Sequence, residues 1–186
     1  MSPLQFAIAR TALGAFGVVW SDSRIVRTWL HDRTHDATRR NILRLFPQAR
    51  AGTPPRLVAH AMADVVGLLA GDPRIAGGTL DMTGLPEFDR RVYELARTIP
   101  PGETLTYGAV AEALGEAPMR ARDVGQALAR NPFAPIVPCH RVVAANGRLG
   151  GYSAPGGAST KRRLLELEGA AIVAPQPVQT GLFDHH

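Results

Sequence analysis

The residues best suited to chemistry lie at 136–143, Ile-Val-Pro-Cys-His-Arg-Val-Val, a stretch that holds the single cysteine of the 186-residue chain. His140 follows Cys139 directly. A thiol is a nucleophile in its thiolate form, which a nearby imidazole or helix N-terminus favours. We expect residues 136–137 to form a short buried strand, and Pro138 to present the cysteine on a stiff turn. A lone cysteine can also be an inert buried residue, and that alternative stays open at this point.

The stretch resembles the active-site signature of the O6-alkylguanine-DNA alkyltransferases, or methylated-DNA–protein-cysteine S-methyltransferases. Further motifs match the order and approximate spacing of that family: Thr106-Tyr107-Gly108, Ala121-Arg122, Asn131-Pro132, Gly151-Tyr152-Ser153 and Leu164-Leu165-Glu166-Leu167-Glu168-Gly169. The match extends from about Phe88 to Gly169. The resemblance implies direct DNA repair, in which an alkyl group moves irreversibly from O6-alkylguanine, and from O4-alkylthymine, to the protein.

The catalytic roles that follow from this resemblance involve four residues. Cys139 is the acceptor and is used once per molecule, without a cofactor. His140 takes the thiol proton through a bridging water, and Glu168 orients and stabilises the imidazole. Tyr107 donates a hydrogen bond to N3 of the guanine and assists its departure. Without the resemblance, Tyr107 would be interpreted as a packing residue and Glu168 as an exposed acid at a helix end.

The same resemblance assigns four residues to the substrate pocket. Main-chain groups of Val142 and the side chain of Ser153 contact the edge of the guanine, and Tyr152 forms a wall of the pocket. Asn131 braces the active-site turn through hydrogen bonds to the backbone. These roles are expectations about a pocket that encloses a single base.

The target carbon lies inside a DNA duplex, so the base must rotate out of the helix. The resemblance assigns Arg122 to the space that the base leaves. Residues 120–148 contain five arginines and one acid, Asp123, and this local excess suits phosphate binding. We expect Arg120 and Arg141 to contact the DNA as well, although a solvated charged face is the alternative. Asp123 replaces a small uncharged residue of the family and should weaken phosphate binding.

The composition is that of an ordinary globular protein, with 45% hydrophobic and 20% charged residues and a net charge of +5. No apolar run has the length of a membrane span, and Arg10 interrupts the apolar stretch near the N-terminus, so we expect no signal peptide. One cysteine excludes a Cys-rich zinc site and fits a reducing cytoplasm. We expect a monomer that contains no metal ion.

We predict an α/β (α+β) fold in three parts. Residues 1–85 form an N-terminal α/β scaffold domain, and residues 86–172 form a mainly helical domain that binds DNA and accepts the alkyl group. Residues 173–186 form a flexible tail. The segment 77–86, rich in glycine and ending in proline, is the expected linker between the domains.

The N-terminal half shows strand patterns over 4–9, 15–20 and 24–30, separated by turn residues, which predict an antiparallel meander. Helices are expected over 35–46 and 57–69. Their inward positions are Ile42, Leu45 and Phe46 in the first, and Val58, Met62, Val65, Val66 and Leu69 in the second.

The C-terminal half must position the cysteine, and its hydrophobic pattern is helical. Apolar residues at three- and four-residue steps predict a helix over 87–99. Thr106 is a candidate N-cap for the next helix, and a further helix is expected over 119–129. The last two would form a helix-turn-helix whose second helix faces DNA. A closing helix over 161–168 should be capped by Thr160.

The tail contains a short motif of its own, Gln-Thr-Gly-Leu-Phe at 179–183. It resembles the peptide by which bacterial replication and repair proteins dock on the sliding clamp. Leu182 and Phe183 would fill an apolar pocket, and Gln179 would form a hydrogen bond at its edge. The alternative is a tail whose apolar pair packs on its own domain.

Three functions are compatible with the residues. The first is a single-turnover alkyltransferase, in which Cys139 gains the alkyl group. The second is an alkylated-DNA-binding or regulatory module that leaves the lesion unchanged. The third is a cysteine hydrolase, which would need a distant histidine and a separate Asn or Asp partner. The motif set favours the first.

Overall fold

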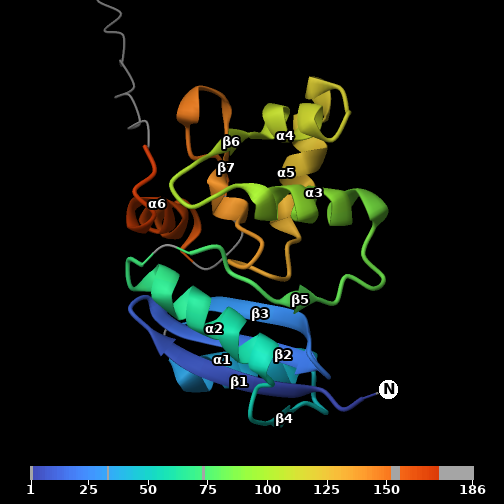
Figure 1. Cartoon of the computed structure of the whole chain (residues 1–186), viewed down its shortest axis with the longest axis vertical. Helices are drawn as coiled ribbons and strands as arrows, with labels where there is room; N and C mark the ends of the chain where they lie inside the picture. Colours follow the sequence, from blue (N-terminus) through green and yellow to red (C-terminus); the bar gives the residue numbers. More distant parts are fainter. Residues whose placement is uncertain (1, 33, 73, 152–155, 172–186) are drawn as a thin grey trace, which may run out of the picture.

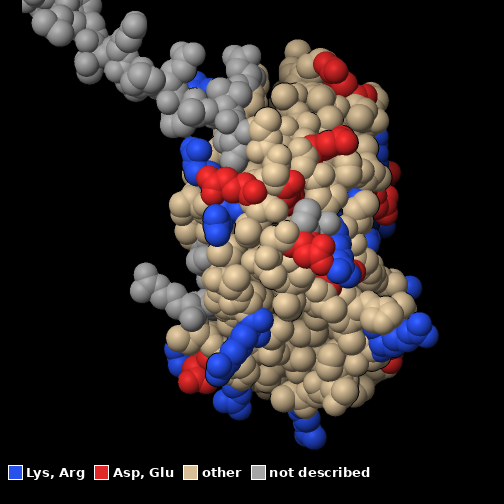
Figure 2. Space-filling view, turned by 60° about the vertical axis from the view of Figure 1, so that its left-hand side comes forward, with Lys and Arg blue, Asp and Glu red and all other residues tan. Residues whose placement is uncertain are grey.

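The structure is a computed structural model that describes residues 2–32, 34–72, 74–151 and 156–171. A sheet with two helices forms the lower half of the molecule in Figure 1, and a mainly helical half lies above it. This arrangement confirms the predicted α/β class and the order of its parts. Figure 2 shows acidic and basic side chains beside one another over the upper half of one face, and mainly basic ones over the lower half.

The sheet is built on the predicted three-stranded meander. Strands β1 (Gln5–Thr11), β2 (Gly14–Ser21) and β3 (Arg24–Asp32) pair antiparallel in sequence order. Two-residue strands, β4 (Arg50–Ala51) and β5 (Thr79–Leu80), add to the edges in parallel and give the order β4-β1-β2-β3-β5. The sheet is therefore mixed and not purely antiparallel. Strands this short show no alternation, which is why the sequence did not reveal them.

Helices α1 (His35–Leu45) and α2 (Arg56–Leu69) cover opposite faces of this sheet (Figure 1). Successive residues of a strand point to opposite faces, so Val18 of β2 packs with α2 while Val19 packs with α1. At Gly17, a Cβ atom would lie 2.5 Å from Cγ2 of Thr38. A residue with a side chain at position 17 would therefore push α1 away from the sheet.

Two inward positions predicted in these helices are wrong. Leu45 is 51% exposed, because Ile42 and Phe46 occupy the inner side at this end of α1. Val66 is only partly buried, since Leu68 and Ala61 occupy the inner face of α2 together with the other predicted residues.

The C-terminal half begins with α3, which ends before Pro100, as its pattern predicts. Its elements are α3 (Glu87–Thr98), β6 (Leu105–Thr106), α4 (Tyr107–Ala113), the 3₁₀ turn η1 (Pro118–Arg120), α5 (Ala121–Ala129), the 3₁₀ turn η2 (Cys139–Arg141), β7 (Val142–Val143), the 3₁₀ turn η3 (Ala145–Gly147) and α6 (Gly157–Leu167). Helices α4 and α5 pack against each other in the predicted helix-turn-helix position. Strand β6 pairs in parallel with β7 and so joins the start of α4 to the cysteine segment.

One predicted helix cap is present and another is wrong. Oγ1 of Thr106 accepts a hydrogen bond from the backbone N–H of Ala109 at 3.1 Å, which caps α4. Thr160 does not cap α6, because the helix starts three residues earlier and buries Thr160 in its first turn. The N-cap is Gly156, at φ 85°, where a Cβ atom would lie 2.2 Å from Oγ1 of Thr160.

The two halves share one buried apolar cluster, in which Trp20 and Val65 lie with Tyr93 and Val137. Strand β3 also holds the segment that precedes the cysteine, since Oγ1 of Thr28 donates to the carbonyl of Ala134 at 2.6 Å. The expected linker 77–86 includes β5 and so extends the sheet. Among the helices of the described ranges, none combines the length and the apolar character that crossing a bilayer requires.

Candidate active site

Cys139 opens the short turn η2 and is almost completely buried, with 5% of its surface exposed. The residues before it, 136–137, are buried as predicted but form a turn and not a strand. The backbone N–H of Cys139 donates to the carbonyl of Val137 at 2.8 Å, and that of Arg141 donates to the carbonyl of Pro138 at 2.9 Å. Local bonds of this kind hold the cysteine at a fixed position.

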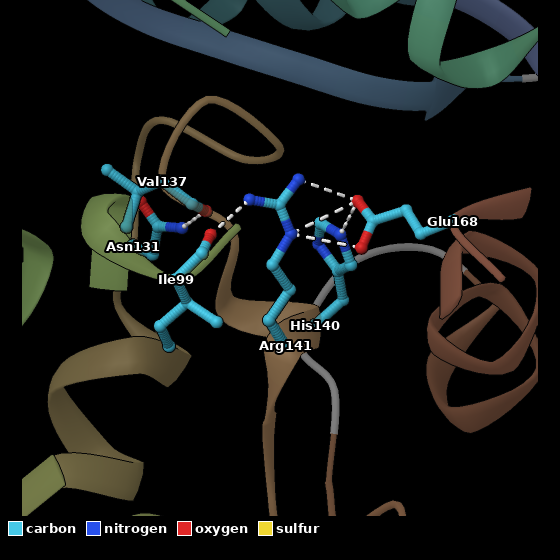
Figure 3. A network of polar contacts seen from close by, with 6 residues as sticks. All are labelled: Ile99, Asn131, Val137, His140, Arg141 and Glu168. Carbon is cyan, nitrogen blue, oxygen red and sulfur yellow. Dashed lines mark hydrogen bonds and ion pairs between the residues drawn. The ribbon is translucent and has the colours of Figure 1, made fainter. Parts of the chain in front are cut away.

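Asn131 ties this turn from the side. Its Nδ2 donates to the carbonyl of Val137 at 2.9 Å (Figure 3). Its Oδ1 accepts from the backbone N–H of Phe133 at the same distance. Both bonds run from the side chain to the backbone, which is the geometry expected for a residue that braces the segment. The turn is thereby fixed two residues before Cys139.

The side chains of His140, Arg141 and Glu168 form a buried cluster, and the first two directly follow the cysteine in the chain (Figure 3). Nε2 of His140 lies 2.8 Å from Oε1 of Glu168. Nη2 and Nε of Arg141 donate to Oε1 and Oε2 of the same carboxylate, at 2.8 and 3.0 Å. Turn η2 supplies two members, and the residue after α6 supplies the third.

The charges in this cluster follow from burial and pairing. Burial acts to raise the pKa of Glu168, but hydrogen bonds from His140 and Arg141 outweigh it and bring this pKa down to about 2. Burial lowers the pKa of His140 more than the carboxylate raises it. At neutral pH, therefore, Glu168 is an anion, Arg141 is its counter-ion and the imidazole is neutral.

A neutral imidazole whose Nε2–H donates to Glu168 carries its lone pair on Nδ1. This Nδ1 is buried and has no hydrogen-bond partner among the described protein atoms. The ring can therefore accept a proton at Nδ1 while Glu168 stabilises the charge that forms. That arrangement is the one a general base needs.

The prediction that Arg141 contacts DNA is wrong. Arg141 is 3% exposed, and its guanidinium is occupied by Glu168 and by the carbonyl of Ile99, to which Nη1 donates at 2.6 Å. A buried arginine in these bonds cannot reach a phosphate. Sequence patterns alone do not reveal this pairing, because an arginine next to a candidate site suits phosphate binding and internal pairing equally well.

Tyr107 and Lys161 form a second polar pair beside the cysteine. Nζ of Lys161 donates to the hydroxyl of Tyr107 at 3.4 Å and to the carbonyl of Val142 at 2.6 Å. The lysine is fully buried, and burial lowers its pKa to about 8, while its interaction with Cys139 acts in the opposite direction. Burial raises the pKa of Tyr107, and Cys139 adds to that shift.

Sequence reasoning missed Lys161. The signal that could have found it is compositional, because Lys161 is the only lysine among 21 basic residues. A chain that uses arginine everywhere else keeps a lysine where the cation is buried next to the cysteine. Lysine changes its charge state on burial much more readily than arginine does.

The cysteine opens onto a pocket of about 560 Å³, whose walls also include Tyr107, Arg122, Gly125 and Gly151. A pocket of this volume is in the range for small organic ligands. The ring of Tyr107 fits closely against Gly150, where a Cβ atom would lie 3.2 Å from the ring. The predicted pocket residues Tyr152 and Ser153 lie outside the described residues.

The helix-turn-helix carries two of the predicted DNA-binding residues, Arg120 and Arg122, at the start of α5. Arg122 is exposed in the first turn of α5 and lines the pocket. Arg120 occupies the N-cap position of α5, where Nε donates to Oδ2 of Asp123 at 2.7 Å. Within the described ranges, no cluster of three or more His, Cys, Asp or Glu side chains is arranged to hold a metal ion.

Comparisons with known proteins show which family this chain resembles. The family described as 6-O-methylguanine DNA methyltransferase, DNA binding domain, matches residues 87–170. A Mycobacterium leprae protein named methylated-DNA–protein-cysteine methyltransferase is 48% identical over 125 residues, which are 66% of this chain and 73% of that protein. A Mycobacterium tuberculosis protein of the same name is 42% identical over 139 residues, which are 74% of this chain and 79% of that protein.

Solved structures extend the similarity to the whole fold. The crystal structure of the Mycobacterium tuberculosis O6-methylguanine methyltransferase superimposes with a TM-score of 0.70 at 33% identity, covering 89% of this chain and 93% of that one. The structure of the Mycobacterium tuberculosis protein in complex with DNA matches with the same score and identity, over 89% of this chain and 92% of that one.

Proposed function

The chain belongs to the O6-methylguanine-DNA methyltransferase family, and on this premise we propose that Cys139 is the residue that accepts the alkyl group, once per molecule. The enzyme is a methylated-DNA–protein-cysteine methyltransferase that repairs DNA directly. The observation that carries the proposal is the position of the chain's single cysteine, in the pocket wall next to the His140–Glu168 pair.

In the proposed reaction, the sulfur of Cys139 attacks the saturated carbon on O6. The carbon–sulfur bond forms as the carbon–oxygen bond breaks, and the electron pair of that bond passes to the guanine. The thiol proton moves to Nδ1 of His140 through a bridging water, and Glu168 stabilises the imidazolium. Tyr107 donates a hydrogen bond to N3 of the departing base. A thioether does not return the alkyl group, so the protein is consumed.

Base rotation supplies the substrate to the pocket. Extruding a nucleotide costs about a few kcal/mol, and less when a lesion already weakens the pair. Arg122, exposed beside the pocket, is the residue that fills the vacated space. Main-chain groups of Val142, the side chain of Ser153 and the ring of Tyr152 complete the recognition of the base. O4-alkylthymine enters the same pocket as a second substrate.

Intact-protein mass spectrometry after incubation with an O6-methylguanine duplex tests the proposal. The mass should rise by one methyl group, peptide mapping should place it on Cys139, and the DNA should contain plain guanine. Cys139→Ala should gain no mass while still binding the duplex, because the DNA contacts lie on other residues. Binding without any transfer by the wild-type protein would support the alkylated-DNA-binding alternative, and turnover beyond one equivalent would exclude single use.

For the tail we propose a second binding partner, the bacterial sliding clamp. Residues 179–183 lie outside the described residues, and the proposal rests on the sequence Gln179, Leu182 and Phe183. A fluorescent peptide spanning 175–186 should bind the purified clamp, whereas a Leu182→Ala, Phe183→Ala peptide should not. If both peptides bind the clamp equally well, or if neither binds, the sliding clamp is excluded as a partner of this motif.

The protein is further proposed to act as a monomer in a reducing cytoplasm. A chain with one cysteine gains nothing from an oxidising compartment. Light scattering of the purified protein, alone and with a short duplex, should give the mass of one chain and of a one-to-one complex.

A further inference from the structure

Arg120, at the N-cap of α5, is held by carboxylates on both sides. Nε donates to Oδ2 of Asp123 at 2.7 Å, and Nη1 donates to Oε2 of Glu116 at 3.2 Å. The guanidinium also lies over the ring of Phe88, 4.7 Å from its centroid. Glu116 is shared, since its Oε1 accepts from Nη1 of Arg91 at 3.1 Å.

This cluster lies at the beginning of the helix that the helix-turn-helix turns toward DNA. The N-terminal residues of such a helix approach the duplex most closely. Arg122, two residues after Arg120, is exposed and lines the pocket. Arg120 keeps 42% of its side chain exposed and Asp123 keeps 44%, so their contact faces solvent and can be exchanged.

Arg120 binds its two carboxylates through the same guanidinium N–H groups that would bind a DNA phosphate. Guanidinium groups bind carboxylate and phosphate oxygens with the same planar pattern of donors. While Nε and Nη1 of Arg120 bind these two carboxylates, the same two nitrogens are not available to a DNA phosphate. The local arginine excess around the cysteine is therefore smaller than the sequence suggests.

We propose that Asp123 and Glu116 form an internal competitor for Arg120, which a DNA phosphate must displace before this arginine contributes to binding. The inference rests on the proposed function, because it assumes that α5 faces the duplex. Asp123 acts in this way as an autoinhibitory residue. It lowers affinity for DNA in general and sets how strongly binding depends on salt.

The salt dependence distinguishes this competition from simple repulsion. Each additional phosphate contact steepens the slope of log affinity against log salt by about 0.9. If Asp123→Asn releases Arg120 to a phosphate, the variant should bind more tightly than wild type at low salt. That advantage should shrink about 3.5-fold between about 50 and about 200 mM salt. If Asp123→Asn only removes repulsion and adds no phosphate contact, the plots of log affinity against log salt for the variant and the wild type should be nearly parallel.

The experiment measures fluorescence anisotropy of a labelled O6-methylguanine duplex with Cys139→Ala proteins, so that binding is not followed by transfer. Within this background, the Asp123→Asn protein is compared across the salt series with the protein that keeps Asp123. Asp123→Asn, Glu116→Gln is included because Glu116 alone can hold the arginine. Asp72→Asn is the matched control, since Asp72 also pairs with an exposed arginine, Arg74, on the surface. The control should leave affinity and slope unchanged.

The decisive arm is Arg120→Gln, Asp123→Asn. It should return to the wild-type slope, because the gain comes through Arg120. The proposal is overturned if both Asp123 variants keep the wild-type slope, or if the steeper slope survives removal of Arg120. When Cys139 is kept, the Asp123→Asn variant should react with free O6-benzylguanine at the wild-type rate. A wild-type protein that shows no salt-dependent DNA binding would instead overturn the proposed function.

Discussion

Glu168 accepts hydrogen bonds from His140 and Arg141 through the same Oε1 atom, at 2.8 Å from each donor nitrogen. One carboxylate thus serves a neutral base and a permanent cation, and all three side chains are buried. Removing water from such a group is costly unless every charge is paired. The cluster therefore links the chemistry of the cysteine to the stability of the fold.

The first prediction concerns stability in acid. The folded pKa of Glu168 is about 2, below its usual 4.5, so its contribution to stability is complete above pH 4.5 and is lost as the pH falls toward 2. His140 also has a lowered pKa, so stability already falls as the pH drops below 6.5. Urea unfolding from pH 7 downward should show both losses.

His140→Gln separates the two contributions. This variant should lose the upper part of the pH dependence and keep a smaller lower part, because Arg141 still pairs with the Glu168 carboxylate. A wild-type free energy of unfolding that stays constant from pH 7 to 4.5 would contradict the assignment of a neutral buried imidazole.

The second prediction uses the buried position of Arg141. Arg141→Met leaves the Glu168 carboxylate without its cation, and breaking a buried pair costs about 3–5 kcal/mol. The free energy of unfolding should fall by that amount, while the salt slope of DNA binding should not change. A variant of normal stability with a reduced salt slope would restore the sequence-based assignment of Arg141 to DNA.

Much of the fold follows from the sequence, because local patterns determine it. The meander, the two helices on the sheet and the helix-turn-helix all have clear periodicity and turn residues. The pairings of β4 and β5 were missed, since two residues carry no pattern. The start of α6 was misplaced, because a left-handed glycine at 156 replaces the usual polar cap.

The site is predictable to the extent that motifs place its residues in order. Cys139, His140 and Glu168 were expected together, and the structure brings them together. The sequence could not separate Arg141, which is buried, from Arg122, which is exposed, because both are arginines close to the cysteine in the motif order. Burial depends on contacts such as Arg141 with Ile99, 42 residues apart, which no local pattern reveals.

The third prediction concerns Lys161. Its charge favours a thiolate at Cys139, because the interaction between the two groups raises the pKa of the lysine and must act equally on the cysteine. In Lys161→Met, thiolate absorbance should therefore appear at higher pH than in the wild-type protein. Transfer at neutral pH should slow for duplex DNA and for free O6-benzylguanine alike.

Lys161→Arg provides the control for charge. It restores a cation but not the compact ammonium that reaches the carbonyl of Val142, so it should recover the thiolate titration more fully than the rate. If the Cys139 thiolate appears at the same pH in Lys161→Met as in the wild-type protein, the lysine serves only to fill the core.

The last prediction separates Arg122 from the chemistry. Arg122 is exposed in the first turn of α5 and lines the pocket, whereas His140 and Glu168 are buried and paired with each other. Arg122→Ala should therefore slow repair of a duplex much more than reaction with free O6-benzylguanine, because the free base needs no extrusion.

Arg162→Ala, a change of the same type on α6, is the control and should alter neither rate. Single-turnover rates measured with both substrates, and with a mismatched duplex, test this. A mismatch already weakens pairing and should reduce the defect of Arg122→Ala. Equal losses on free base and duplex would show that Arg122 shapes the pocket and does not act on the DNA stack.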